Sequence, residues 1–110
     1  MADAWKFFDV AKEIRAREAS GKLYREFLRV PTLSCGIYCL PAGAKDLQSP
    51  HDEDEVYYVI SGSGRLQVGG EEHSIGPGSV LYVQATEEHS FFEIDEDITL
   101  LVFFASGGPG

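Results

Sequence analysis

The chain has 110 residues, of which 44% are hydrophobic and 12% aromatic, enough apolar surface for one buried core. Its formal net charge is -9, from 18 acidic against 9 basic residues, so a nucleic-acid backbone or an anionic membrane surface would be repelled. The sequence contains neither a secretory leader pattern nor an apolar run long enough to span a bilayer. We therefore expect a single domain over residues 1–110, located in the cytoplasm, with neither nucleic acid nor membrane as partner.

One helix is expected near the N-terminus, within a helical segment at residues 1–22. Asp9 is a suitable N-cap, and Gly21 lies where a C-terminal stop belongs. Apolar residues recur at near-helical spacing, at Phe8, Ala11, Ile14 and Ala19. The pattern predicts about three helical turns.

From residue 23 onward the pattern changes to short runs rich in β-branched and aromatic residues. These runs predict strands at 23–30, 34–40, 56–60, 65–68, 79–83, 90–94 and 98–105. The separators are turn-forming sequences, among them 61–64, 69–70 and 95–97. Gly69-Gly70 fits a two-residue type I′ hairpin turn, in which both central residues have positive φ. The spacing predicts an all-β fold, an antiparallel barrel or sandwich over residues 23–105.

The last predicted strand is almost unbroken apolar sequence, which suits a strand buried on both faces. One face would then meet the interior and the other a second sheet or subunit, which favours a homodimer. The glycine-rich tail at 106–110 is expected to be flexible. Cys35 and Cys39 are too far apart along a strand for a disulfide, so they are expected to be free thiols, with a metal-binding pair as the alternative.

Two histidines and a carboxylate stand out as candidate metal ligands: His51, Glu55 and His89, with Glu53 and Gln48 close by. His51 and Glu55 are about 13 Å apart in a straight strand, near the limit at which both side chains reach one metal ion. We therefore expect the chain to bend between them.

The spacing of these residues resembles the two sequence motifs of the cupin family. The first motif is matched by Gly43, His51, Glu55 and Gly62, with Ser49 in place of the first histidine. The second motif is matched by Gly78 and His89, whereas its Pro, Gly and Asn are replaced by Gln84, Thr86 and Glu93. The resemblance implies a cupin-type barrel, also called a jelly roll or double-stranded β-helix.

The resemblance also implies one divalent transition metal, Fe, Mn, Ni, Zn or Cu, held by His51, Glu55 and His89. Two histidines and one carboxylate are the ligand set of non-haem Fe(II) oxygenases, which leave positions open for substrate and oxygen. Gln48 would be a fourth ligand if a bulge turned it inward. A rival assignment replaces Glu55 by Glu53, but only Glu55 keeps the motif's six-residue spacing to Gly62.

If Glu55 faces the metal, strand alternation turns Tyr57 inward as well, as a pocket wall with a hydroxyl near the substrate and a candidate catalytic residue. The alternative is a core tyrosine with its hydroxyl hydrogen-bonded at the rim. His73 belongs to neither motif and is expected on the surface. The parity of the strand at 34–40 stays open, and on either parity the cavity is mostly apolar, which favours a small organic ligand.

Three functional interpretations follow. The first is a metal-dependent enzyme acting on a small organic molecule, most simply a dioxygenase-like oxidoreductase, with a non-redox isomerase, cyclase or lyase in the same class. The second is a barrel that binds a small ligand without catalysis, and the third is a barrel that has lost its site. The sequence does not separate them.

Overall fold

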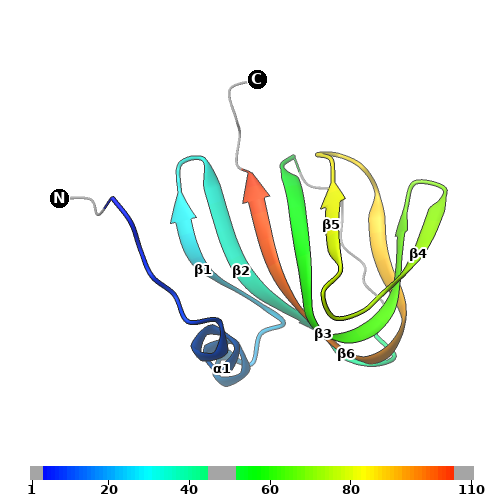
Figure 1. The fold of residues 1–110 in the computed structure, drawn as a ribbon, viewed down its shortest axis with the longest axis horizontal. Coiled ribbons are helices and arrows are strands. Elements are labelled where there is room, and N and C mark those ends of the chain that lie inside the picture. The colour runs from blue at the N-terminus through cyan, green and yellow to red at the C-terminus, as the bar shows by residue number, and fades with distance from the viewer. Residues whose placement is uncertain (1–3, 45–51, 106–110) are drawn as a thin grey trace.

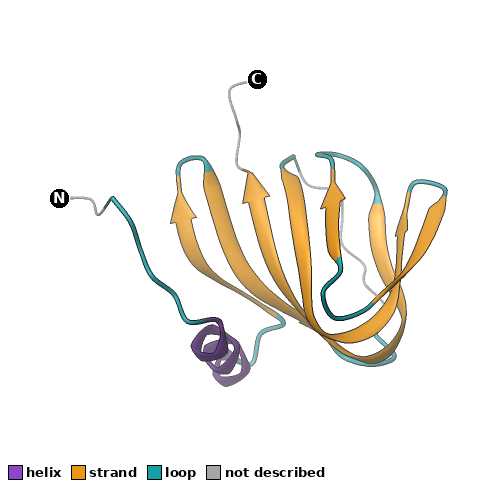
Figure 2. Ribbon diagram, in the orientation of Figure 1, coloured by secondary structure: helices purple, strands orange, loops and turns teal. Residues whose placement is uncertain are grey.

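The computed structural model describes residues 4–44 and 52–105, and over these ranges the chain is a curved antiparallel sheet with one helix beside it (Figures 1 and 2). The strand order is β1-β2-β6-β3-β4, and β5 pairs with β3. This confirms the expected all-β architecture with one short helix. The elements are α1 (Val10–Ser20), β1 (Tyr24–Val30), β2 (Leu33–Leu40), β3 (Asp54–Val68), β4 (Glu71–Ile75), β5 (Val80–Val83) and β6 (His89–Ala105).

Helix α1 has the caps that the sequence predicts. The Asp9 side chain accepts hydrogen bonds from the backbone N–H groups of Ala11 and Lys12, and Gly21 ends the helix in the left-handed conformation, at φ 73°. The helix packs against β1 and β2, and Glu13 forms an ion pair with Arg25 of β1 at 2.8 Å. In the described part of the chain, no helix has the length and apolarity needed to cross a membrane.

Two long bent strands stand where the sequence predicts four short ones. Residues 61–64 and 95–97 were expected to be turns, but they lie inside β3 and β6, which Figure 1 shows curving together. The β3–β6 register shifts three times between Val59 and Arg65. Such bulges bend a strand without ending it, so the local turn chemistry produces a bend here and the turn prediction was wrong.

The hairpin at Gly69-Gly70 is present and joins β3 to β4, a strand that the sequence did not predict. Four of the five β4 residues are exposed, so the strand lacks the alternation of a half-buried strand. Of the two turn glycines only Gly69 has a positive φ, 58°. One positive φ, at the first central position, is typical of a type II′ turn rather than the expected type I′.

The core lies inside the bend, between the two halves of the curved sheet. Its buried residues come from β2 to β6: Leu40, Tyr57, Val59, Leu66, Ile75, Val83, Phe91, Ile94, Ile98, Leu100 and Val102. On β2, Leu40 belongs to this core and Tyr38 packs against it, which settles the open strand parity. Cys35 and Ile37 are buried on the other face of that strand. The tail at 106–110 lies outside the described residues.

Candidate metal centre and adjoining pocket

Of the predicted site residues, the structure describes Glu55, Tyr57 and His89, whereas His51 and Gln48 lie outside the described ranges. Glu55 and Tyr57 stand two positions apart near the start of β3 and share its inner face. His89 is the first residue of β6 and pairs with Val68, at the far end of β3. Because both strands bend, the start of β6 returns to lie opposite the start of β3.

Glu55, Tyr57 and His89 form a buried polar cluster with exposed fractions of 1%, 1% and 6%. Oε1 of Glu55 lies 3.5 Å from Nε2 of His89, and the Tyr57 hydroxyl lies 3.1 Å from the same nitrogen. On the other side of the ring, Nδ1 lies 3.0 Å from the carbonyl oxygen of Glu87. Since a carbonyl only accepts, Nδ1 donates to it, and Nε2 is the ring nitrogen that faces the cluster.

This donor set fits a metal cation. A buried carboxylate oxygen close to an imidazole nitrogen favours a cation, either a proton or a metal ion, between the two. Two ligands of a tetrahedral ion with bonds of about 2.1 Å are about 3.4 Å apart, close to the Glu55–His89 separation. The backbone hydrogen bond at Nδ1 is the support that metal-bound histidines commonly have. Within residues 4–44 and 52–105, no three His, Cys, Asp or Glu side chains are grouped as a metal site.

The other candidates lie elsewhere. Glu53, the rival carboxylate, lines a pocket, and it is Glu55 whose carboxylate contacts His89. His73 is exposed on β4, as expected. Cys35 and Cys39 are free, as expected, and Cys35 is buried.

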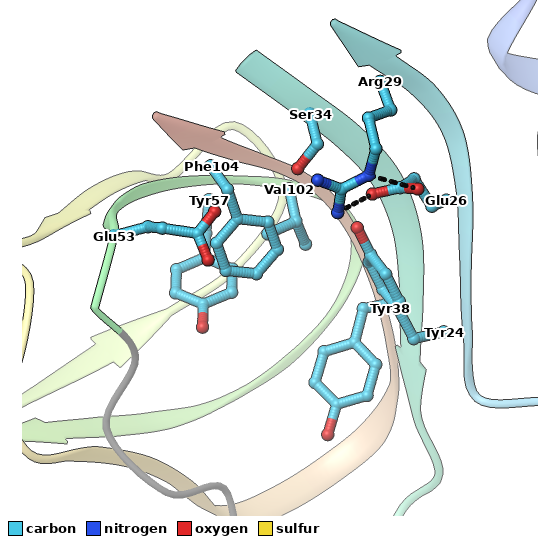
Figure 3. Close-up of a pocket in the computed structure, with 9 residues that line it drawn as sticks. All are labelled: Tyr24, Glu26, Arg29, Ser34, Tyr38, Glu53, Tyr57, Val102 and Phe104. Atoms are coloured by element: carbon cyan, nitrogen blue, oxygen red, sulfur yellow. Dashed lines mark hydrogen bonds and ion pairs between the residues drawn. The ribbon is translucent and has the colours of Figure 1, made fainter. Parts of the chain in front are cut away.

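A pocket of about 400 Å³ adjoins the cluster, and Tyr57 belongs to both (Figure 3). Among the residues that the structure describes, aromatic rings and apolar side chains form most of its wall, together with three charged groups. Its lining residues are Tyr24, Glu26, Arg29, Ser34, Tyr38, Glu53, Tyr57, Val102 and Phe104.

The part of this wall that β1 contributes was not predicted from the sequence. Strand alternation from Glu26 would turn Arg29 to the opposite face, but a register shift between Glu26 and Leu28 brings it back, and Arg29 pairs with Ser34. The charged pattern of β1 in the sequence is compatible with a solvated edge strand. No local signal marks the bulge.

The family model that matches the chain is described as "Cupin domain" and covers residues 36–104. The chain belongs to the cupin family. The uncharacterized protein SCO3923 of Streptomyces coelicolor is 45% identical over 89 residues, 81% of this chain and 85% of that protein. The 5-nitrosalicylic acid 1,2-dioxygenase of Bradyrhizobium sp is 27% identical over 71 residues, 64% of this chain but only 34% of that enzyme.

Among solved structures, TT1209 from Thermus thermophilus superposes with a TM-score of 0.71 at 22% sequence identity, covering 92% of this chain and 97% of that one. At this identity the likeness shows the fold alone.

Two departures from the second cupin motif coincide with unusual backbone geometry. Thr86, at the motif's Gly position, has φ 67°, and Glu93, at its Asn position, has φ 45°. Within the described ranges these are the two residues other than glycine with positive φ. Glycine and asparagine, the residues that the motif has at these two positions, tolerate this conformation best.

Proposed function

We propose that this chain is a metal-dependent cupin enzyme, most simply a dioxygenase-like oxidoreductase, that acts on a small organic molecule bound in the pocket beside the metal. The observation that carries the proposal is the buried approach of Glu55 to His89, with a carboxylate oxygen and an imidazole nitrogen 3.5 Å apart. The sequence relationship to 5-nitrosalicylic acid 1,2-dioxygenase supports an oxygenase within this class.

In this proposal His51, Glu55 and His89 hold one divalent transition metal, and Gln48 is a candidate fourth ligand. The metal would supply a Lewis acid and open positions for oxygen or substrate. The chain's own residues do the rest. The Glu87 carbonyl orients the His89 ring, the aromatic rings of the pocket offer apolar surface to the substrate, and the Tyr57 hydroxyl contacts the histidine.

The test is elemental analysis of untagged protein that has been purified without chelators and without a metal-affinity column. We expect near-stoichiometric Fe, Mn, Ni, Zn or Cu in the parent protein and its loss in His89→Ala. His73→Ala is the matched control, because His73 is exposed on β4 and its removal leaves the cluster intact. Equal metal content in the parent and His89→Ala would refute the site.

A loaded parent protein is then screened for oxygen uptake with phenols, diketones and thiols. Turnover that proceeds equally well without oxygen would replace the oxygenase by a lyase, isomerase or cyclase. A parent protein that holds no metal and takes up none would favour a non-catalytic ligand-binding barrel.

We also propose that the chain forms a homodimer in the cytoplasm through the outer face of its sheet. Tyr58 of β3 pairs with Val80 of β5, and Tyr82 lies two positions further along β5. These three side chains are 40%, 65% and 62% exposed, respectively, which is much apolar surface for one sheet face. Sedimentation equilibrium tests the dimer, with Tyr82→Glu expected to shift it to monomer.

A further inference from the structure

We propose that the pocket beside the metal centre binds the cationic group of its ligand, an alkylated ammonium held among aromatic rings and paired with Glu53. The inference rests on the proposed function in one respect, that the pocket's occupant is the substrate of the metal site. Three properties of the pocket carry it: charge, ring geometry and shape.

The pocket's charged groups favour a cation over an anion. Arg29 is engaged with Glu26 of its own strand, with Nε to Oε2 at 3.1 Å and Nη2 to Oε1 at 2.7 Å (Figure 3). An anionic ligand would have to displace Glu26 from this two-point pair. The second carboxylate of the lining, Glu53, has no ion pair to any residue in the described ranges. Among the described lining residues, two carboxylates and one guanidinium therefore leave one unneutralised negative charge.

Four aromatic rings line the same pocket as Glu53. The Tyr24 ring is nearly perpendicular to two others, to Tyr38 at 74° and to Phe104 at 84°, with ring centroids 6.2 and 6.3 Å apart. Tyr57 adds a fourth ring. Ring faces attract a cation within about 6 Å, and several rings around one space are the usual arrangement for alkylated ammonium groups.

The position of Tyr24 depends on Gly36, its neighbour on β2. A Cβ at residue 36 would lie 2.5 Å from the Tyr24 hydroxyl oxygen and 2.7 Å from the Arg25 carbonyl. The lack of a side chain there lets the ring lie against the strand. The Tyr24 hydroxyl is buried and makes no hydrogen bond to any residue that the structure describes, so a ligand that donates or accepts there would relieve the cost of an unpaired polar group.

The pocket also has the size for such a ligand and lies beside the Glu55–Tyr57–His89 cluster. Its volume of about 400 Å³ falls in the range of small-molecule sites. Tyr57 lines it and places its hydroxyl 3.1 Å from His89 Nε2. A ligand with its cation near Glu53 would extend past Tyr57 toward the metal centre.

The test compares choline with 3,3-dimethylbutan-1-ol, its neutral isostere, and with benzoate, by isothermal titration calorimetry on the full chain. We expect choline to bind at least about 10-fold more tightly than the isostere, since shape is matched and only the charge differs. Glu53→Gln should weaken choline binding by about 5- to 10-fold and leave the isostere unchanged. Glu71→Gln, an exposed carboxylate on β4, is the matched control and should change neither.

Equal binding of choline and the isostere, or no binding of choline, would overturn the proposal. Both outcomes are measured on the parent protein, so they do not depend on whether a variant folds. Tighter binding of benzoate that is lost in Arg29→Gln would overturn it in favour of an anion site. Running the titrations on His89→Ala as well separates this inference from the proposed function. Choline selectivity in a parent protein that never holds metal would leave the ligand class standing and the metal-dependent enzyme refuted.

Discussion

Oε1 of Glu55 and Nε2 of His89 lie 3.5 Å apart in a buried cluster, and the Tyr57 hydroxyl meets the same nitrogen at 3.1 Å. In the tautomer with its single proton on Nδ1, which suits the Glu87 carbonyl, the Tyr57 hydroxyl donates its hydrogen bond to the Nε2 lone pair. That lone pair is the one a metal ion would use. The hydroxyl and the metal therefore compete for one position.

Tyr57→Phe should tighten metal binding. The substitution removes a hydrogen bond that has to break when Nε2 becomes a ligand, and a bond of about 1 kcal/mol corresponds to about 5-fold in affinity. Titration of metal-free protein against a competing chelator measures the change. Weaker binding in Tyr57→Phe would mean that the hydroxyl itself helps to hold the metal.

Gly62→Ala should be far more destabilising than Gly78→Ala. Both glycines have φ 90°, so both substitutions carry the conformational cost of a left-handed residue, about 1–2 kcal/mol. A Cβ at residue 62 would also collide with the Asp97 carbonyl and the Ile98 Cα of β6, whereas residue 78 faces open space. We expect at least about 3 kcal/mol lost for Gly62→Ala from backbone that cannot move aside.

Urea denaturation of the two variants measures the difference. Similar losses of unfolding free energy for both glycines would show that the close approach of β3 to β6 at residue 62 relaxes without cost.

Thr86→Gly should raise stability. Thr86 is β-branched and has φ 67°, a backbone conformation that costs about 1–2 kcal/mol for such a residue. Glycine removes this cost, but its greater freedom in the unfolded chain lowers the stability by about 0.5–1 kcal/mol. The net gain, about 0.5–1 kcal/mol, corresponds to a Tm increase of about 3–6 °C.

The control is Ala85→Gly, because Ala85 is not among the residues with positive φ and should lose stability on the same change. A lowered Tm for Thr86→Gly, measured by circular dichroism, would show that the positive φ of Thr86 does not strain the backbone. Glu93→Asn is expected to act in the same direction, since asparagine tolerates positive φ better than glutamate.

Cys35 should resist thiol reagents until the protein unfolds. Burial raises the pKa of its thiol to about 11, which leaves only about one thiolate in a thousand at pH 8. The same shift makes the folded state lose stability as pH rises from about 8.5, the pKa of an unfolded cysteine, toward 11. The rate at which Cys35 reacts with a disulfide reagent at pH 8 tests this resistance, measured in Cys39→Ser so that Cys35 is the thiol followed. Rapid labelling of Cys35 in the folded protein would contradict the raised pKa.

Local sequence was enough to predict the helix, its two caps and the family. Asp9 and Gly21 act through bonds to residues within a few positions, so their roles do not depend on the rest of the fold. The inward parity of Tyr57 with Glu55 also followed from alternation within one strand.

What the sequence by itself determined, then, was the helix with its caps, the shared parity of Glu55 and Tyr57, and the motif spacing that identifies a cupin. Only the tertiary structure decided that residues 61–64 and 95–97 bend two long strands rather than end four short ones, and that a bulge returns Arg29 to the pocket face. The same bends bring Glu55 to His89. The physical reason is that bulges and bends are set by pairing across strands, between residues far apart in the chain, and no local pattern records that pairing.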